Sequence, residues 1–138
     1  MNKSVVLLSG GMDSLVTAAI ADKECSECYF VHFNYGQRTE AKELEAFRKI
    51  AEHYQPQDTL ICDLDYLKNI KSSSLIDKQM VMPLYYDDTY QPEKEVPNTY
   101  VPFRNAVMLA IAVSWAESLR ADKVYIGAVE EDSSRYPD

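Results

Sequence analysis

Positive charge is scarce in this sequence, and long apolar runs are absent. Its 138 residues include 14 lysines and arginines against 22 aspartates and glutamates, which gives a net charge of −8. This balance disfavours a large nucleic-acid-binding surface, because such a surface needs clustered basic residues. No apolar run approaches the roughly 20 residues of a membrane-spanning helix, and the N-terminus lacks the pattern of a signal peptide. We therefore expect a cytoplasmic protein with no nucleic-acid or membrane partner.

Cysteine and histidine are also rare, with three and two residues respectively. An odd number of cysteines without a secretory signal predicts reduced thiols. Cys25 and Cys28 have the C-x-x-C spacing that can hold zinc or an iron–sulfur cluster, but a complete site would need Cys62 or a partner chain. We favour two small thiols in a turn. His53 stands alone, and His32 is expected to be a packed, hydrogen-bonded core residue.

Only four glycines occur in the chain, and two fall together in Ser9-Gly10-Gly11-Met12-Asp13-Ser14. This stretch lies between the apolar runs 5–8 and 15–20, an order that predicts a strand, a tight turn and a helix. Paired glycines let the backbone bend and approach a ligand closely. A helix N-terminus offers unpaired N–H groups to an anion. The stretch therefore predicts a phosphate site; a plain turn with Asp13 or Ser14 as a helix cap is the alternative.

The rest of the chain alternates apolar segments with amphipathic ones. We expect strands at residues 4–8, 29–34, 59–62 and 124–129, and helices at residues 13–22, 40–54, 66–70 and from Pro102 onward. Strands separated by helices predict an α/β fold with a doubly wound, mainly parallel, Rossmann-like sheet and right-handed crossovers. The length suits a single domain over residues 1–138.

The two longest predicted helices each have one apolar face. Thr39 is expected to cap the second helix, and Pro102 to take the first position of the last helix, where a missing N–H is harmless. Helical spacing predicts buried faces formed by Ala41, Leu44, Phe47, Ala51 and Tyr54, and by Val107, Met108, Ile111, Ala112, Trp115 and Leu119. Residues 71–101 show no sustained periodicity, so a binding loop and a disordered connection are equally open there.

Polar residues follow the predicted strands at the points where they end. Asn34–Arg38 follows the second strand and Glu130–Asp138 follows the last one, while Arg104 and Asn105 lie in the first turn of the last helix. The carboxyl ends of parallel strands share one edge of a sheet, and ligands bind at that edge in open α/β folds. We therefore expect these segments and Ser9–Ser14 to surround one crevice.

The Ser-Gly-Gly-x-Asp-Ser stretch resembles the pyrophosphate loop (PP-loop) of the N-type ATP pyrophosphatases, which cut ATP between the α and β phosphates. With residues 34–38 (Asn-Tyr-Gly-Gln-Arg), 100–105 (Tyr-Val-Pro-Phe-Arg-Asn) and 127–134 (Gly-Ala-Val-Glu-Glu-Asp-Ser-Ser), the chain resembles one family among them, the 7-cyano-7-deazaguanine synthases of queuosine biosynthesis. The resemblance covers nearly the whole chain and implies a sheet of the adenine-nucleotide alpha hydrolase type. Arg135 stands where the family usually has glycine, which would demand a different backbone.

Members of this family continue well past the position of Asp138, with a further helix and strand and a four-cysteine zinc site. The resemblance therefore implies a truncated chain that lacks the family's C-terminal portion. It implies that Zn²⁺ would be held by cysteines beyond Asp138, so we expect no zinc ligands in this chain. It also implies a homodimer.

The resemblance implies an ATP-dependent carbon–nitrogen ligase that uses ATP and Mg²⁺. Such an enzyme converts 7-carboxy-7-deazaguanine and ammonia to 7-cyano-7-deazaguanine through adenylated intermediates. Two alternatives stay open. One is a PP-loop tRNA sulfur-insertion enzyme, which the C-x-x-C pair would suit but the acidic charge would not. The other is a nucleotide-binding fragment without turnover.

The resemblance also assigns site residues by position. Asp13 and Arg104 are the catalytic candidates, and Asp13 is the candidate for positioning Mg²⁺. The planar fork of Arg104 would suit a carboxylate or an α-phosphate. The expected ATP-binding residues are Leu8, Ser9, Gly10, Gly11, Met12, Asp13, Ser14, Phe33, Asn34 and Tyr35. The expected substrate-binding residues are Gln37, Arg38, Arg104, Asn105, Asp132, Ser133, Tyr136 and Asp138.

Overall fold

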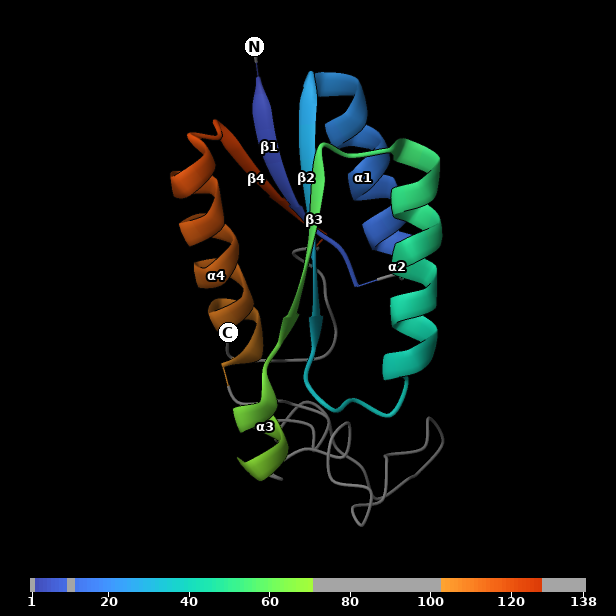
Figure 1. Cartoon of the computed structure of the whole chain (residues 1–138), viewed down its shortest axis with the longest axis vertical. Coiled ribbons are helices and arrows are strands. Elements are labelled where there is room, and N and C mark those ends of the chain that lie inside the picture. Colours follow the sequence, from blue (N-terminus) through green and yellow to red (C-terminus); the bar gives the residue numbers. More distant parts are fainter. Residues whose placement is uncertain (1, 10–11, 71–102, 128–138) are drawn as a thin grey trace, which may run out of the picture.

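Parallel strands form the central sheet of the structure, a computed structural model that describes residues 2–9, 12–70 and 103–127. Among these residues the strands are β1 (Lys3–Leu7), β2 (Glu27–Asn34), β3 (Asp58–Asp63) and β4 (Lys123–Ile126), in the spatial order β3-β2-β1-β4 (Figure 1). Leu7 pairs with Val31 of β2 and with Ile126 of β4. All these strands end at the same edge of the sheet, which confirms the predicted parallel arrangement.

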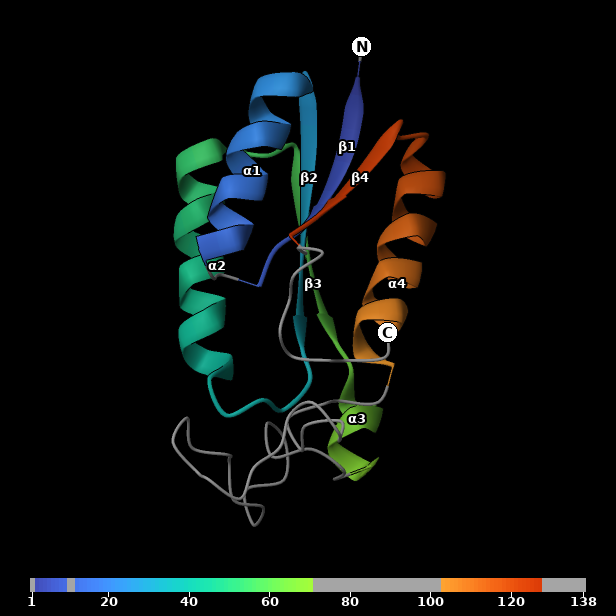
Figure 2. The ribbon, with the colours of Figure 1, turned by 180° about the vertical axis from the view of Figure 1, so that it is seen from behind.

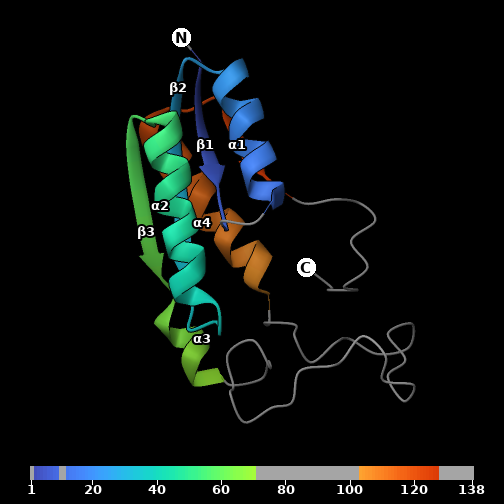
Figure 3. The same cartoon turned by 90° about the vertical axis from the view of Figure 1, so that its right-hand side faces the viewer.

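Helices cover both faces of this sheet. α1 (Met12–Glu24) and α2 (Glu40–Tyr54) lie on one face and α4 (Arg104–Leu119) on the other, as Figure 1 and the reverse view in Figure 2 show. Figure 3 shows α1 and α2 side by side, with the short α3 (Asp65–Ile70) beyond the carboxyl end of β3. Coverage of both faces confirms the predicted doubly wound α/β fold. None of the described helices is long and apolar enough to cross a bilayer.

Each face of the sheet has its own apolar core, because β1 sends alternate side chains to opposite sides. Val5 and Leu7 belong to the core under α4, whereas Val6 and Leu8 belong to the core under α1 and α2. All four side chains are at most 9% exposed. Burial on both faces explains why this strand is a continuous apolar run instead of an alternating one.

The chain changes its direction across the sheet at β1. From β1 it crosses through α1 to β2 on one side, whereas α4 leads into β4 on the other side. Crossovers on opposite faces leave an opening outside the carboxyl ends of β1 and β4, which is where open α/β sheets bind ligands. The N-terminal turns of α1 and α4 both lie at this edge.

The structure corrects two predictions about helix starts. α4 begins at Arg104, not at Pro102, because Phe103 has a left-handed backbone with a φ of 55° that interrupts a helix. Pro102 itself lies outside the described residues. Thr39 precedes α2 but makes no side-chain capping hydrogen bond. Instead, the Glu40 carboxylate accepts a hydrogen bond from the Gly36 N–H at 3.2 Å.

The predicted helix faces are mostly confirmed, with one exchange in α2. Phe47 of α2 is buried, as are Met108 and Ala112 of α4. Ala41 is exposed, however, and the buried residue that the prediction missed is Ile50. Ile50 follows Phe47 by three residues, so the two side chains lie on the same face of the helix.

The ends of several elements differ slightly from the prediction. β2 begins at Glu27, two residues before its expected start, and α1 continues to Glu24. Local spacing does not determine where a strand stops pairing with its neighbours, so such ends are the least certain part of a sequence-based prediction. Residues 128 and 129 of the last expected strand, and the segment 71–101, lie outside the described residues.

Candidate functional site at the carboxyl edge of the sheet

A cavity of about 550 Å³ opens at the carboxyl edge of the sheet. It is formed by the ends of β1, β2 and β4 and by the N-terminal turns of α1, α2 and α4. Seven of the residues expected from the sequence to bind ATP or substrate line it, namely Leu8, Ser9, Ser14, Phe33, Tyr35, Arg104 and Asn105. The structure thus brings together residues from three separate motifs around one space.

The two serines at the ends of the PP-loop motif are bonded to each other. The Ser9 N–H donates to Ser14 Oγ at 2.8 Å, and the two hydroxyl oxygens lie 2.9 Å apart. Ser14 is buried in the first turn of α1, whereas Ser9 is exposed. These bonds tie the start of the motif to a helix N-terminus, where backbone N–H groups favour an anion. Gly10 and Gly11 lie outside the described residues.

The end of β4 packs closely against the first turn of α1. A Cβ atom on Gly127 would lie 3.0 Å from Thr17 Oγ1 and 3.2 Å from the Asp13 carbonyl oxygen. Thr17 Oγ1 donates to that same carbonyl at 2.7 Å, so the two groups hold each other in place. Glycine therefore permits the approach that lets β4 and α1 line one cavity.

A hydrogen-bonded turn follows β2 and fixes the backbone of Tyr35. Gly36 has a φ of 81°, which glycine adopts without strain. Gln37 Oε1 accepts from the Tyr35 N–H at 2.9 Å, and its Nε2 donates to Glu43 Oε2 at 2.6 Å and to the Phe33 carbonyl at 3.4 Å. Since Gln37 is buried and its amide bonds within the turn, it holds this corner of the cavity together.

Arg104 reaches the cavity from the first residue of α4. Its Nη1 donates to the Tyr35 hydroxyl at 3.1 Å, and its guanidinium carbon lies 5.6 Å from the centre of the Tyr35 ring. Nε and Nη2 both donate to Asn105 Oδ1, at 3.2 and 3.1 Å. The phenol and the amide fix the plane of the guanidinium, which is a group that recognises carboxylates and phosphates.

Other predicted site residues lie away from the cavity wall or outside the described part of the chain. Met12, Asp13 and Arg38 are exposed, and Asn34 donates its amide to Asp63 Oδ1 on β3 at 3.2 Å. Together with Gln37, these residues do not line the cavity, and their contacts with ligands stay predictions. The predicted residues outside the described ranges are Gly10, Gly11, Asp132, Ser133, Tyr136 and Asp138.

The cavity is also lined by residues that were not predicted from the sequence, notably His32 and Glu43. His32 is confirmed as a buried, hydrogen-bonded residue, because it is 0% exposed and its Nδ1 lies 2.9 Å from the Leu8 carbonyl oxygen. The one feature of the sequence that could have indicated this role is the position of His32 near the carboxyl end of β2, where ligands bind. The further lining residues are Leu7, Ala106, Met108, Leu109, Ile126 and Gly127.

The three cysteines lie in two separate cores. Cys25 and Cys28 are buried in the core under α1 and α2, whereas Cys62 packs against the core under α4. Burial raises the pKa of the Cys28 and Cys62 thiols, which favours their protonated form. The sheet separates Cys62 from the C-x-x-C pair, and no group of three or more metal-ligating side chains occurs among the described residues.

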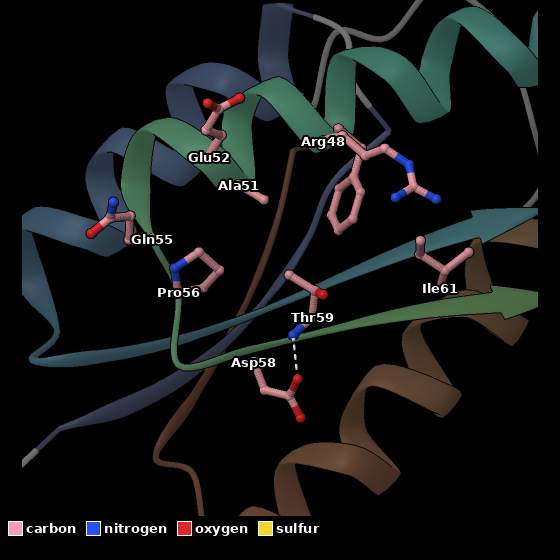
Figure 4. A pocket seen from close by; sticks show the side chains of 9 residues that line it. Arg48, Ala51, Glu52, Gln55, Pro56, Asp58, Thr59 and Ile61 are labelled. Carbon is pink, nitrogen blue, oxygen red and sulfur yellow. Dashed lines mark hydrogen bonds between the residues drawn. The ribbon is translucent and has the colours of Figure 1, made fainter.

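A second hollow, of about 440 Å³, lies between α2 and β3 (Figure 4). Arg48 and Glu52 reach it from α2, and Asp58 and Thr59 from β3. Asp58 Oδ1 accepts a hydrogen bond from the Thr59 N–H at 2.8 Å. None of the residues predicted to bind ligand lines this hollow, so it serves as a reference surface for binding experiments.

The parallel sheet, with helices on both faces and a cavity at its switch point, defines a doubly wound α/β fold of the adenine-nucleotide alpha hydrolase type. A solved structure of this fold is the NH3-dependent NAD synthetase from Campylobacter jejuni in complex with the nitrate ion. It matches with a TM-score of 0.55 and 14% identity, over 88% of this chain and 45% of that one. At this identity the likeness shows the fold alone.

Within this class, the chain belongs to the family described as queuosine biosynthesis protein QueC, whose family model matches residues 3–138. It is 56% identical over 136 residues to the 7-cyano-7-deazaguanine synthase of Chlorobium phaeobacteroides and 52% identical to that of Nitratiruptor sp.. Each match covers 99% of this chain, but 58% and 59% of the respective relative. The family resemblance is thus confirmed, and the chain spans somewhat over half the length of these relatives.

Proposed function

We propose that the chain provides the ATP site of a ligase that converts 7-carboxy-7-deazaguanine and ammonia to 7-cyano-7-deazaguanine. The observation that carries this proposal is that Ser9, Ser14 and Arg104 line the same cavity. Two of these residues begin and end the PP-loop motif, and the third lies in the motif at residues 100–105. The proposal is supported by family membership and by relatives that bear the name of this activity.

The phosphates of ATP are assigned to the Ser9–Ser14 motif. Pyrophosphate carries several negative charges when it leaves, and donors that are already oriented stabilise such developing charge most effectively. The Ser9 and Ser14 hydroxyls and the first backbone N–H groups of α1 are those donors. The adenine is assigned to the end of β2, where Phe33 and Tyr35 both line the cavity.

The reaction begins when the substrate carboxylate attacks the α-phosphorus of ATP and pyrophosphate leaves. Ammonia then displaces AMP to give an amide. A second ATP activates the amide oxygen, and loss of that oxygen with AMP leaves the nitrile. Arg104 is assigned to the carboxylate or α-phosphate of the first step, because its guanidinium is held in one plane by Tyr35 and Asn105. The fork neutralises negative charge and orients the attacking oxygen.

Asp13 fits the role of holding Mg²⁺ beside the phosphates. It is an exposed carboxylate in the first turn of α1, next to Ser14. Protein sites for Mg²⁺ commonly use one or two carboxylates, with phosphate oxygens and waters as the other ligands, so one aspartate suffices. Bound Mg²⁺ supplies charge neutralisation on the triphosphate. No comparable donor set for Zn²⁺ occurs among the described residues, and no step is assigned to zinc.

A second candidate is nucleotide binding without turnover by this chain. It is favoured by one observation, that the chain covers 58% of its Chlorobium phaeobacteroides relative. A tRNA sulfur-insertion activity is less well supported, because the chain matches the QueC family and has a net charge of −8.

Pyrophosphate release separates these candidates. The purified chain is incubated with 7-carboxy-7-deazaguanine, ammonium and Mg-ATP, and each component is omitted in turn. The ligase proposal predicts release that depends on the deazaguanine acid, together with a product whose composition is that of the acid plus ammonia minus two waters. ATP binding by calorimetry without any release would support binding alone, and absence of ATP binding would contradict both. Sedimentation of the same sample tests the predicted homodimer.

A further inference from the structure

We propose that His32 is a positioning residue that fixes the start of the PP-loop motif through the carbonyl of Leu8. The inference rests on the proposed function, because it assigns His32 a part in ATP binding. His32 lies in β2, whereas Leu8 directly follows β1 and directly precedes Ser9. The contact joins residues 24 positions apart in the chain, and both are fully buried.

The hydrogen-bond geometry determines which nitrogen carries the proton. Nδ1 of His32 lies 2.9 Å from the Leu8 carbonyl oxygen. A carbonyl oxygen only accepts hydrogen bonds, so Nδ1 is the donor. The Leu8 N–H donates in turn to the Val31 carbonyl at 2.9 Å. β2 therefore holds both backbone polar groups of Leu8, one through its main chain and the other through the imidazole.

The imidazole itself is held firmly. Its ring stacks on Phe47 of α2, with 5.0 Å between ring centres and 25° between planes. Phe47 is 1% exposed, so the stack is part of the core under α1 and α2. Because Phe47 fixes the imidazole, the bond from Nδ1 restrains the Leu8 carbonyl, and with it the backbone that leads into Ser9.

The second ring nitrogen, Nε2, contributes nothing to the stability of the fold, so the reason for a histidine at this position lies in Nδ1. Nε2 of His32 is buried and has no hydrogen-bond partner among the described residues. A buried polar atom without a partner destabilises a fold, and a phenylalanine of similar shape would avoid that cost. The Nδ1 donation to Leu8 is thus the property that distinguishes histidine at this position. His32 also lines the same cavity as Ser9 and Ser14.

Three substitutions separate this role from simple packing. In His32→Asn the amide nitrogen occupies the place of Nδ1, so the bond to Leu8 is retained. In His32→Gln the amide reaches the place of Nε2 instead, and in His32→Phe the ring is retained without a donor. Calorimetry with Mg-ATP is expected to give a Kd within about threefold of the parent for Asn, and roughly tenfold weaker binding for Gln and Phe. His53→Asn, at an exposed position of α2, is the control.

Hydrogen exchange at the Ser9 amide gives a readout that does not depend on ATP. That amide donates to Ser14 Oγ, so its protection reports the position of the motif's start. We expect protection to persist in His32→Asn and to fall in His32→Phe, while thermal unfolding shows that both variants are folded. Equal protection and equal ATP affinity in His32→Phe and the parent would overturn the inference. A parent that binds no ATP, but whose Ser9 protection depends on the residue at position 32 as described, would contradict the proposed function and leave the positioning role intact.

Discussion

The two ends of the sheet are both rich in polar residues but arrange them differently. At the amino end, charged side chains pair near the surface, Lys3 with Glu27 at 3.9 Å and Lys123 with Glu24 at 3.6 Å. Pairs of this kind contribute little to stability. At the carboxyl end, polar side chains are held around a cavity by hydrogen bonds to one another and to backbone, as the 3.1 Å bond from Arg104 to the Tyr35 hydroxyl illustrates.

This difference distinguishes a closed end of the sheet from an open one. At the amino end, ion pairs and hydrogen bonds join the strand and helix ends to one another, as the 3.0 Å bond from the Lys3 N–H to Asp122 Oδ2 shows. At the carboxyl end the orienting bonds are internal, but the groups that they orient line an open space of about 550 Å³. α1, α4 and β2 each run from one end to the other, so each element provides a matched pair of positions.

The largest effect is expected from the α1 pair. Asp13→Ala should abolish pyrophosphate release, because Asp13 is the residue assigned to Mg²⁺. Asp22→Ala, at the other end of the same helix, should leave release unchanged. Loss of this carboxylate from the first turn of α1 should lower the free energy of unfolding by only about 1 kcal/mol, since it interacts with the positive end of the helix dipole. The assay is coupled pyrophosphate detection at saturating Mg-ATP, and normal turnover by Asp13→Ala would refute the assignment.

The α4 pair is expected to show the next largest effect. Arg104→Lys should lower kcat/KM about 100-fold, because a point charge does not reproduce the planar fork held by Tyr35 and Asn105. Arg120→Lys, at the exposed carboxyl end of α4, retains the charge at the opposite end and should retain activity. Steady-state kinetics of both variants decides the matter. Full activity in Arg104→Lys would mean that charge, not the fork, is what matters, and similar losses in the two variants would mean that the effect is not specific to the cavity.

A smaller effect is expected from the β2 pair. Tyr35→Phe removes the hydroxyl that accepts from Arg104 but keeps the ring beneath the guanidinium, so kcat should fall about three- to tenfold. Tyr29→Phe removes a hydroxyl that lies 3.5 Å from Glu27 Oε2 at the amino end and should leave kcat unchanged. KM for ATP should be nearly unchanged in both variants. A change in the KM for ATP alone would mean that the Tyr35 hydroxyl, like its ring, acts in nucleotide binding and does not orient Arg104.

The smallest effect on function is expected at the amino end, where Tyr125 OH donates to Glu24 Oε2 at 2.6 Å. This bond lowers the pKa of Glu24 and raises that of Tyr125. A raised phenol pKa stabilises the fold below the unfolded value of about 10 and loses that contribution as the pH rises past it. A lowered carboxyl pKa stabilises above the unfolded value of about 4.3 and loses its contribution as the pH falls through the folded value.

Tyr125→Phe should therefore flatten the dependence of the thermal unfolding midpoint on pH at both the alkaline and the acid ends. ATP affinity near neutral pH should not change, because the Tyr125 hydroxyl bonds to Glu24 at the amino end and Tyr125 does not line the cavity. Thermal unfolding between pH 3 and 11, with calorimetry at neutral pH, tests both statements. An unchanged pH profile would show that the bond contributes nothing to folding.

Features of the fold that depend on local spacing were predictable from the sequence, whereas long-range contacts were not. The parallel α/β sheet was predicted from the alternation of apolar segments such as β1 with amphipathic segments such as α2. No local pattern pairs Arg104 with Tyr35 across 69 residues or aims His32 at Leu8. The left-handed backbone of Phe103 likewise depends on tertiary context, and for this reason the expected start of α4 at Pro102 was wrong.

The central claim is that the cavity at the carboxyl end is the nucleotide site. The most direct test is a titration of the isotope-labelled chain with Mg-ATP, followed through the backbone amide signals in NMR spectra. The claim predicts the largest shifts at Ser9, Ser14, His32 and Arg104, with little change at Lys3 and Lys123. Shifts concentrated at the amino end, or at Arg48 and Thr59 in the hollow between α2 and β3, would contradict it.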